Sequence, residues 1–301
     1  MFPQRLKEIT KKVKIYLFNI GFFLLFFSIQ ISAQTSYRES DSLICINIFH
    51  FAETNSLSRL PINMVFLKVA ESFIGTPYAA HTIETPAAEI VKIHLSGLDC
   101  YTFIESSLAI SRLIKEKNYS FSNYLKEIES IRYRSGKLSG WTSRLHYFSD
   151  WIYDLSQRGI VKNITKDLGG IPYVKKINFM SANFKAYPKL KNNPAFTDSI
   201  KKIESVINKR KYYFIPQDSI ANIEGKIFSG DILGITTNIP GLDISHTAIA
   251  VRLDDRRVHI LHAPNVGKKV QISSLPLSEY IKSHKHQTGI MVVRISPAHV
   301  K

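Results

Sequence analysis

The sequence is poor in cysteine, with only Cys45 and Cys100 among 301 residues. Folds that depend on disulfides are small and dense in cysteine, so this chain is not built on a disulfide framework. Cys45 lies in an apolar stretch, residues 43–49, that needs no bridge to be buried, and it follows Ile44 rather than the small residue expected before a lipoprotein cysteine. We expect both thiols to be free, and a Cys45–Cys100 bridge would exclude a catalytic role for Cys100.

Acidic residues are scarce: 24 Asp and Glu stand against 40 Lys and Arg, giving a net charge of +16 at pH 7. Such an excess favours an anionic surface or partner. The chain lacks a basic helix, an aromatic stacking strip and zinc-finger spacing, which makes nucleic acid a poor candidate. The lysines are spread widely, as solvated faces usually are, and the excess fits a transient association with an anionic cell envelope. They include Lys115/Lys117, Lys175/Lys176, Lys189/Lys191, Lys201/Lys202 and Lys268/Lys269.

Only one long apolar run is present, residues 15–31, and five basic residues precede it. Ala33 places a small residue where a signal peptidase cleaves, so residues 1–33 are predicted to be a secretory signal peptide, whose removal leaves a net charge of +12. The run exceeds the usual signal length, so an uncleaved membrane anchor is the alternative. In both cases we expect an exported, periplasmic protein with a soluble body.

The rest of the chain changes from helical to strand patterns. Residues 34–60 are predicted to be a polar N-terminal segment with a short apolar stretch, and no linker divides residues 61–301. Apolar spacing predicts helices over residues 61–73, 99–115 and 196–209. Short β-branched segments predict strands over residues 227–236, 246–253, 258–263 and 289–295. This order is typical of an α+β domain.

Cys100 lies in the first turn of a predicted helix, directly after the capping residue Asp99. A thiol there meets unpaired backbone N–H groups and the positive end of the helix dipole. Both favour the thiolate, the form of cysteine that attacks carbonyl groups. The alternative is a buried structural cysteine, since free cysteine is among the most buried residue types.

A thiol nucleophile needs a base within hydrogen-bond reach. Among ten histidines, His246 opens a predicted strand, and its face continues through Ala248 and Ala250. Small residues beside a histidine would leave room for the cysteine helix to approach. A satisfied structural histidine is the alternative for His246 taken alone.

His262 lies on the next predicted strand and is the candidate for orienting His246. If the loop between the strands is residues 254–256, His262 is a diagonal neighbour of His246 on the same face. A two-residue loop would place His262 on the opposite face. The sequence leaves both registers open.

Two histidines on adjacent strands also suggest a metal site, with Asp243 or His259 as a further ligand. Zinc sites usually show tighter spacing, such as His-Glu-x-x-His, which the chain lacks. We therefore expect no metal and no other cofactor.

Four motifs in a fixed order resemble those of NlpC-type cell-wall cysteine hydrolases, a bacterial branch of the papain-like fold. They are Gly75-Thr76-Pro77-Tyr78, Leu98-Asp99-Cys100, Ser245-His246-Thr247-Ala248-Ile249-Ala250 and His262-Ala263. The match extends over roughly residues 60–296 to an N-acetylmuramoyl-L-alanine amidase-like branch. Further motifs carry it: Thr82-Ile83-Glu84, residues 98–105, residues 144–151, Asn178-Phe179-Met180-Ser181, Gly230-Asp231 and residues 241–247.

The resemblance implies a papain-like α+β fold with the cysteine helix packed on an antiparallel sheet. It also implies that Cys100 is the nucleophile, His246 the base and His262 its orienting partner. Tyr78 would line the pocket, and Asp243 and Ser245 are further candidates for substrate binding.

The interval between Cys100 and His246 is longer than in ordinary NlpC-type peptidases. We interpret residues 118–225 as an insertion that recognises substrate, within a catalytic domain of residues 61–301. Asp150 and Trp151 are its candidates for substrate contact, and packing in the core is the equal alternative.

The resemblance implies cleavage of the N-acetylmuramoyl–L-alanine amide of muropeptides, with peptidoglycan as the partner. One alternative is an endopeptidase that cuts between D-Glu and the diamino acid. A cell-wall binding module without activity is the other. The sequence gives no indication of the oligomeric state.

Overall fold

The computed structural model describes residues 35–85 and 88–297. The predicted signal peptide, residues 1–33, lies outside the described residues. Within the described ranges, no helix is long and apolar enough to cross a membrane. The chain from Thr35 onward forms one compact unit.

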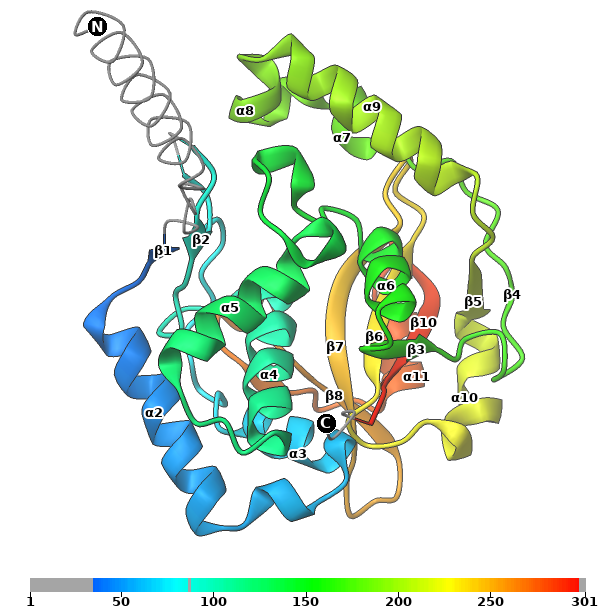
Figure 1. The fold of residues 1–301 in the computed structure, drawn as a ribbon. Helices are drawn as coiled ribbons and strands as arrows, with labels where there is room; N and C mark the ends of the chain where they lie inside the picture. The colour runs from blue at the N-terminus through cyan, green and yellow to red at the C-terminus, as the bar shows by residue number, and fades with distance from the viewer. Residues whose placement is uncertain (1–34, 86–87, 298–301) are drawn as a thin grey trace, which may run out of the picture. The chain divides into compact units, whose positions relative to one another are not determined.

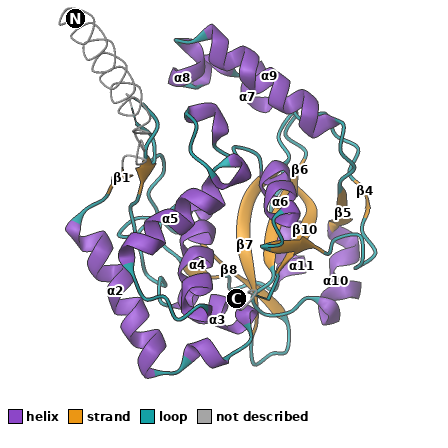
Figure 2. Ribbon diagram, in the orientation of Figure 1, coloured by secondary structure: helices purple, strands orange, loops and turns teal. Residues whose placement is uncertain are grey.

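The first part of this unit is mainly helical, with α2, α3 and α5 packed around α4 (Figures 1 and 2). The apolar stretch 43–49, predicted only as a short segment, lies within a helix that buries Cys45, Ile48 and Phe49. The elements are β1 Thr35–Ser36, α2 Glu39–Thr54, η2 Leu57–Arg59, α3 Ile62–Glu71, β2 Val91–Lys92, α4 Cys100–Lys115 and α5 Phe121–Arg132.

The middle of the chain consists of short elements and one longer helix, α9, which lies with α7 and α8 at the top of Figure 1. Seven buried residues, among them Trp141 and Tyr147, form a hydrophobic cluster that includes Ile200 and Ile207 of α9. The elements are η3 Arg134–Gly136, η4 Trp141–Ser143, α6 Phe148–Gln157, β3 Val161–Asn163, β4 Ile171–Pro172, α7 Phe179–Ala182, η5 Phe184–Ala186, α8 Pro188–Lys191, α9 Pro194–Asn208, β5 Tyr213–Pro216, η6 Gln217–Ser219, α10 Ile220–Ile223 and η7 Glu224–Lys226.

The last part of the chain supplies most of an eight-stranded sheet. Its order is β4-β5-β10-β6-β7-β8-β9, with β3 also paired to β10, and the pairs are antiparallel. The four predicted strands are confirmed, and their ends are shifted by a few residues. They could be predicted because β-branched runs bounded by turn residues are local signals in the sequence. The elements are β6 Ile232–Thr237, β7 Ile244–Arg252, β8 Val258–His262, β9 Gln271–Ile272, α11 Leu277–Lys282 and β10 Gln287–Ile295.

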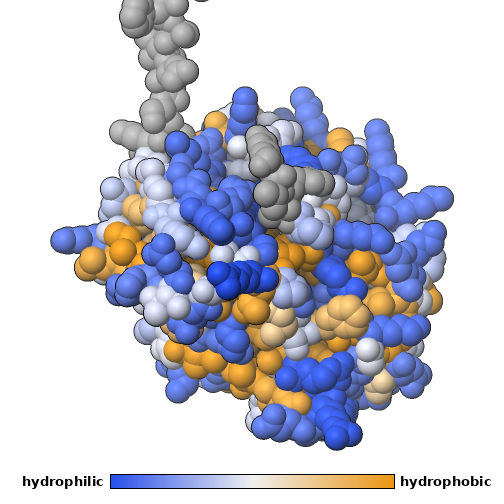
Figure 3. All heavy atoms as spheres, turned by 60° about the horizontal axis from the view of Figure 1, so that its bottom comes forward, coloured by the Kyte–Doolittle hydropathy of each residue, from blue (hydrophilic) through white to orange (hydrophobic). Residues whose placement is uncertain are grey.

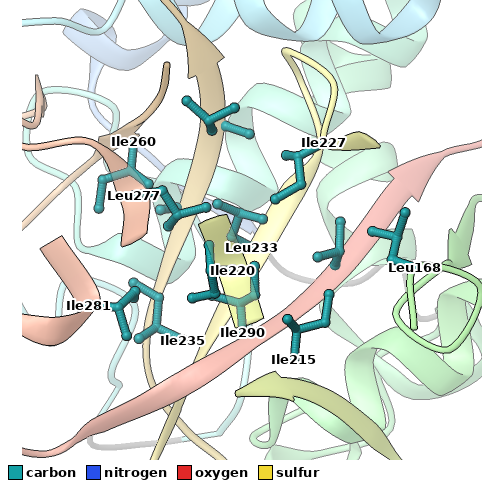
Figure 4. Close-up of a cluster of buried hydrophobic side chains, with 14 of the residues drawn as sticks. Leu168, Ile215, Ile220, Ile227, Leu233, Ile235, Ile260, Leu277, Ile281 and Ile290 are labelled. Atoms are coloured by element: carbon teal, nitrogen blue, oxygen red, sulfur yellow. The ribbon is translucent and has the colours of Figure 1, made fainter. Parts of the chain in front are cut away.

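One face of the sheet carries the main core. Figure 4 shows side chains of β6, β8 and β10 meeting those of α10 and α11, including Leu233, Ile260, Ile290 and Leu277. Ala248 and Ala250 belong to this core. The prediction that these small residues make room for the cysteine helix is therefore wrong, because they pack toward α11.

The opposite face of the sheet receives α4 and α6. Gly234 of β6 lies so close to α6 that a Cβ atom there would be 2.2 Å from the Phe148 ring. Successive strand residues point to opposite faces, which separates this contact from the core of Leu233 and Ile235. On the surface seen in Figure 3, apolar patches lie among hydrophilic side chains.

Candidate active site

Cys100 is the first residue of α4, as the sequence predicts. The Asp99 carboxylate accepts hydrogen bonds from the backbone N–H groups of Tyr101 and Thr102, and the Thr102 hydroxyl completes a capping box. As a first-turn residue, Cys100 has no partner for its N–H within the helix. Both Cys45 and Cys100 are free thiols.

Thr247 joins the cysteine helix to the strand that carries His246. Its hydroxyl donates a 2.6 Å hydrogen bond to the Cys100 carbonyl oxygen. Hydrogen bonds from the Thr247 backbone and side chain also act on the Cys100 thiol. The sulfur therefore lies beside the residue that follows His246.

The thiol is not poised as a thiolate. Burial, and next the Asp99 carboxylate, raise the pKa of Cys100 to about 11, although hydrogen bonds from Thr247 lower it in part. Burial therefore opposes the effect that we predicted for the helix terminus, which favours the thiolate. Desolvation of a charged sulfur outweighs the backbone groups that would stabilise it.

The two imidazoles meet. His246 Nε2 and His262 Nδ1 are 2.9 Å apart, and the strands pair Arg252 with Val258, leaving an odd-numbered loop. The Leu253 N–H donates to the Arg257 carbonyl oxygen, which leaves a three-residue loop, residues 254–256. The same-face register is thus the one the chain adopts. Arg256 in the loop has a left-handed φ of 64°, as three-residue hairpin loops require.

A β-bulge lies next to His246. In the pairing of β6 with β7, Ile235 is opposite His246 and Thr236 is opposite Ile244. Ser245 is the extra residue, and it is exposed. Bulges of this kind re-aim side chains beside functional sites.

Both imidazoles are held neutral. Burial, and next the proximity of His284, lower the pKa of His246 to about 4. Burial, then His246 and His284, lower the pKa of His262 to about 3. His262 Nε2 is buried without a hydrogen-bond partner. The resting pair is therefore available to accept a proton at neutral pH.

A pocket of about 660 Å³ opens beside the pair and is called here the imidazole pocket. Tyr280 of α11, which sequence reasoning missed, packs edge-on against His262 with ring centroids 5.4 Å apart. Burial raises the pKa of Tyr280 and that of Tyr78, and the proximity of Cys100 raises both more weakly. The wall of the imidazole pocket includes Ser245, His246, His262, Tyr280, His284 and Gln287.

The sulfur is close to this group of residues without being bonded to an imidazole. Within residues 35–85 and 88–297, the Cys100 thiol makes no hydrogen bond to His246 or His262, and it is not part of the pocket wall. Bonds between nucleophile and base are often long until substrate binds. Cys100, His246 and His262 therefore lie in one region of the structure, where the thiol and the imidazoles are not hydrogen-bonded to each other.

Of the candidates for substrate contact, Tyr78 and Ser245 lie at this region. Tyr78 is half-buried, and its backbone is held by Leu98, two residues before Cys100. Asp243 is buried instead, where its carboxylate accepts hydrogen bonds from the Ser149 and Ile244 N–H groups. Asp243 thus fastens the hairpin before His246 to α6.

Asp150 and Trp151 are interior residues, each 1% exposed. Asp150 forms ion pairs with Arg134 and Arg210. Trp151 stacks on Phe148, with centroids 5.5 Å apart. Direct contact with substrate, one of the two predictions for these residues, does not agree with this burial, and the packing alternative does.

A metal site is not indicated in the part of the chain that the structure describes, where no group of three or more His, Cys, Asp and Glu side chains could hold an ion. His259, the other proposed ligand, is buried between the Ser273 carbonyl and the Asp255 carboxylate. These bonds give it a structural role in the β8 hairpin.

Comparison with solved structures gives related folds. An N-acetylmuramoyl-L-alanine amidase from Bacteroides uniformis is 33% identical, with a TM-score of 0.74, over 78% of this chain and 99% of its own. A putative xylanase from Bacteroides fragilis is 34% identical, with a TM-score of 0.72, over 76% and 100%. A Legionella pneumophila protein at 18% identity, TM-score 0.65, over 86% and 95%, shares the fold.

No curated protein matches the chain. A family model described as N-acetylmuramoyl-L-alanine amidase-like matches residues 68–290, which include Cys100, His246 and His262. That match covers well over half of the chain. The chain therefore belongs to the AmiA-like, N-acetylmuramoyl-L-alanine amidase-like family of peptidoglycan-acting hydrolases.

Proposed function

We propose that the chain is a cysteine-dependent amidase that hydrolyses the N-acetylmuramoyl–L-alanine bond of muropeptides. The observation that carries the proposal is the hydrogen bond from Thr247 to Cys100, beside an imidazole pair 2.9 Å apart. A free thiol at a helix N-terminus, a neutral base and an orienting group are the parts that nucleophilic catalysis requires. Family membership and the named Bacteroides uniformis amidase support the choice of bond.

The first half-reaction begins with a neutral thiol, because the pKa of Cys100 is about 11 and that of His246 about 4. The sulfur attacks the lactyl carbonyl carbon as its proton passes to His246. The oxyanion accepts a hydrogen bond from the Cys100 N–H at the start of α4. The protonated His246 then donates to the departing L-alanine nitrogen, leaving a thioester on Cys100.

The second half-reaction releases the sugar acid. His246 takes a proton from water, which attacks the thioester carbonyl and returns the thiol. In this proposal His246 Nε2–H donates to His262 Nδ1, which leaves His246 Nδ1 as the acceptor in both steps. No metal enters the reaction, so a chelator is expected to leave the rate unchanged.

The proposal extends to the arrangement and location of the enzyme. Helix α4 packed on an antiparallel sheet by way of Thr247 supports a papain-like arrangement. Export to the periplasm rests on the signal-like residues 1–33. There the basic surface would favour transient contact with the anionic envelope.

Digestion of defined muropeptides, analysed by mass spectrometry, tests the reaction. The amidase releases a peptide that begins with L-Ala, whereas the endopeptidase alternative leaves L-Ala on the sugar. Cys100→Ala should abolish release, and Cys45→Ala, a change at the buried thiol of α2, should preserve it in folded protein. Unchanged turnover by Cys100→Ala would refute the mechanism, and peptide binding without turnover by the unmodified chain would indicate a binding module.

A further inference from the structure

A second cavity, larger than the imidazole pocket, lies between α9 and the β4–β5 segment and measures about 1100 Å³. Its wall contains six cationic side chains and one carboxylate, Glu204. We call it the basic cavity. The cations are Lys175, Lys176, Lys201, Lys209, Arg210 and Lys211.

Part of this charge is already compensated. Arg210 pairs with Asp150, and Lys201 pairs with the exposed Asp198. Lys175 donates to the Thr237 carbonyl oxygen, a neutral group, so its charge remains. Within the described residues, Lys176, Lys209 and Lys211 are exposed and have no ion-pair partner.

Two polar side chains of the wall that are not cationic, Asn208 and Glu204, are hydrogen-bonded within the protein. Asn208 bonds Ile177 through both its amide oxygen and its amide nitrogen. Glu204 is buried and accepts from the Tyr147 hydroxyl and the Ser181 N–H. Glu204, the only carboxylate among the described residues of the wall, is therefore occupied within the protein, and the rest of the wall presents a surplus of ammonium groups.

The basic cavity is connected to the imidazole pocket through the β6–β7 hairpin. Tyr173 at its wall donates to the Asp243 carbonyl oxygen, and Ile177 bridges Gly241. Asp243 is three residues before His246. A ligand in the cavity would thus lie on the structure that positions the base.

We propose that the basic cavity binds the carboxylates of the acidic stem peptide of the substrate. This inference rests on the proposed function, since the stem peptide is the part of a muropeptide that carries D-Glu and diamino acid carboxylates. Ammonium groups bind such carboxylates through charge-assisted hydrogen bonds. The lysine pairs that the sequence presents as ordinary solvated faces would then act together at one site.

Calorimetry with the tetrapeptide L-Ala-D-Glu-diamino acid-D-Ala tests the inference on the full chain carrying Cys100→Ala. Adding Lys176→Glu, Lys209→Glu and Lys211→Glu is expected to weaken binding at least tenfold. A matched control with the same change of charge, Lys117→Glu, Lys126→Glu and Lys137→Glu, should bind as before. Amidating the peptide carboxylates should also weaken binding at least tenfold.

The inference is overturned if the two triple variants bind alike, if the amidated peptide binds equally well, or if inorganic phosphate competes at the peptide's own concentration. Should the charge-reversed protein fail to fold, judged by its melting temperature, the triple Lys→Gln variant takes its place. Because binding is measured without turnover, the two proposals fail separately. Binding at the cavity without cleavage by the unmodified enzyme refutes the proposed reaction, whereas cleavage with no effect of the lysines refutes this inference.

Discussion

The imidazole pocket and the basic cavity both adjoin the loop end of the β6–β7 hairpin and are built from different chemistry. In the pocket, burial lowers the pKa of His246 to about 4 and that of His262 to about 3, so neither carries charge at neutral pH. The wall of the basic cavity instead carries exposed, positively charged lysines. A site that moves a proton needs a neutral base out of water, whereas a site that holds an anion needs permanent charge near it.

Removing the base His246 gives the largest expected effect, and it should change turnover at the imidazole pocket without changing binding at the basic cavity. His246→Ala should lower kcat by about a thousandfold, in line with general-base contributions. Peptide affinity at the basic cavity should stay within twofold. His50→Ala, at an exposed position of α2, is the control. Equal losses of turnover and affinity in His246→Ala would mean that the two sites are one.

Asp150→Asn affects the wall of the basic cavity from the inside of the protein, because the buried Asp150 pairs with Arg210 of that wall. Losing one member of a buried ion pair is expected to cost about 3 kcal/mol of unfolding free energy. Denaturant titration measures it, with the exposed pair member Asp198→Asn expected to change stability by less than about 0.5 kcal/mol. A loss of stability as small as that of the control would show that Asp150 contributes little to the core.

His262→Gln should lower kcat by roughly ten- to a hundredfold, because the amide can still bond His246 but does not share a proton as an imidazole does. Steady-state kinetics on muropeptides gives the value. A KM effect without a kcat effect would place His262 in substrate binding instead of base orientation.

Salt separates the two regions without mutation. Raising sodium chloride from about 0.05 M to about 0.5 M shortens the Debye length severalfold and screens exposed lysines. We expect KM to rise about fivefold and kcat to stay nearly constant. The charge-reversed lysine variant should lose this dependence, and an equal salt response in both proteins would argue against the basic cavity.

The smallest effect is the pH response of kcat. His246 must be neutral to accept the proton, and its pKa is lowered in the folded protein, so activity is lost as the pH falls through about 4. Turnover should be half-maximal there and level through neutral pH. Alkylation of Cys100 should rise with pH up to about 11. An acidic limb near 6.5, the ordinary histidine value, would indicate a solvated base.

Local signals in the sequence predicted the parts of the site that depend on few neighbours. Asp99 followed by Cys100 predicted a capped helix start, and β-branched runs predicted the strands of His246 and His262. The hairpin register needed the length of the loop at Arg256, which sequence alone left open between two values.

Burial, a property of the whole fold, accounts for what the sequence did not predict. It raises the pKa of Cys100 against the effect of the helix dipole, and it decides between the two alternatives that the sequence left open for Asp150 and Trp151 by placing both inside. Tyr280 lies on a helix with no catalytic motif, so only its packing on His262 identifies it. The lysines around the basic cavity come from separate segments, and no spacing in the chain predicts their gathering.

The bulge at Ser245 has a consequence for the length of this part of the chain. Because Ile244 and His246 stand opposite consecutive residues of β6, they face opposite sides of the sheet although only one residue separates them. Deleting Ser245 would make Ile244 and His246 adjacent residues of a regular strand, still on opposite sides of the sheet, so the bond of Asp243 to Ser149 and the contact of His246 with His262 could both remain. The extra residue therefore adds a local bend beside the imidazole pair and does not decide which side of the sheet the imidazole faces.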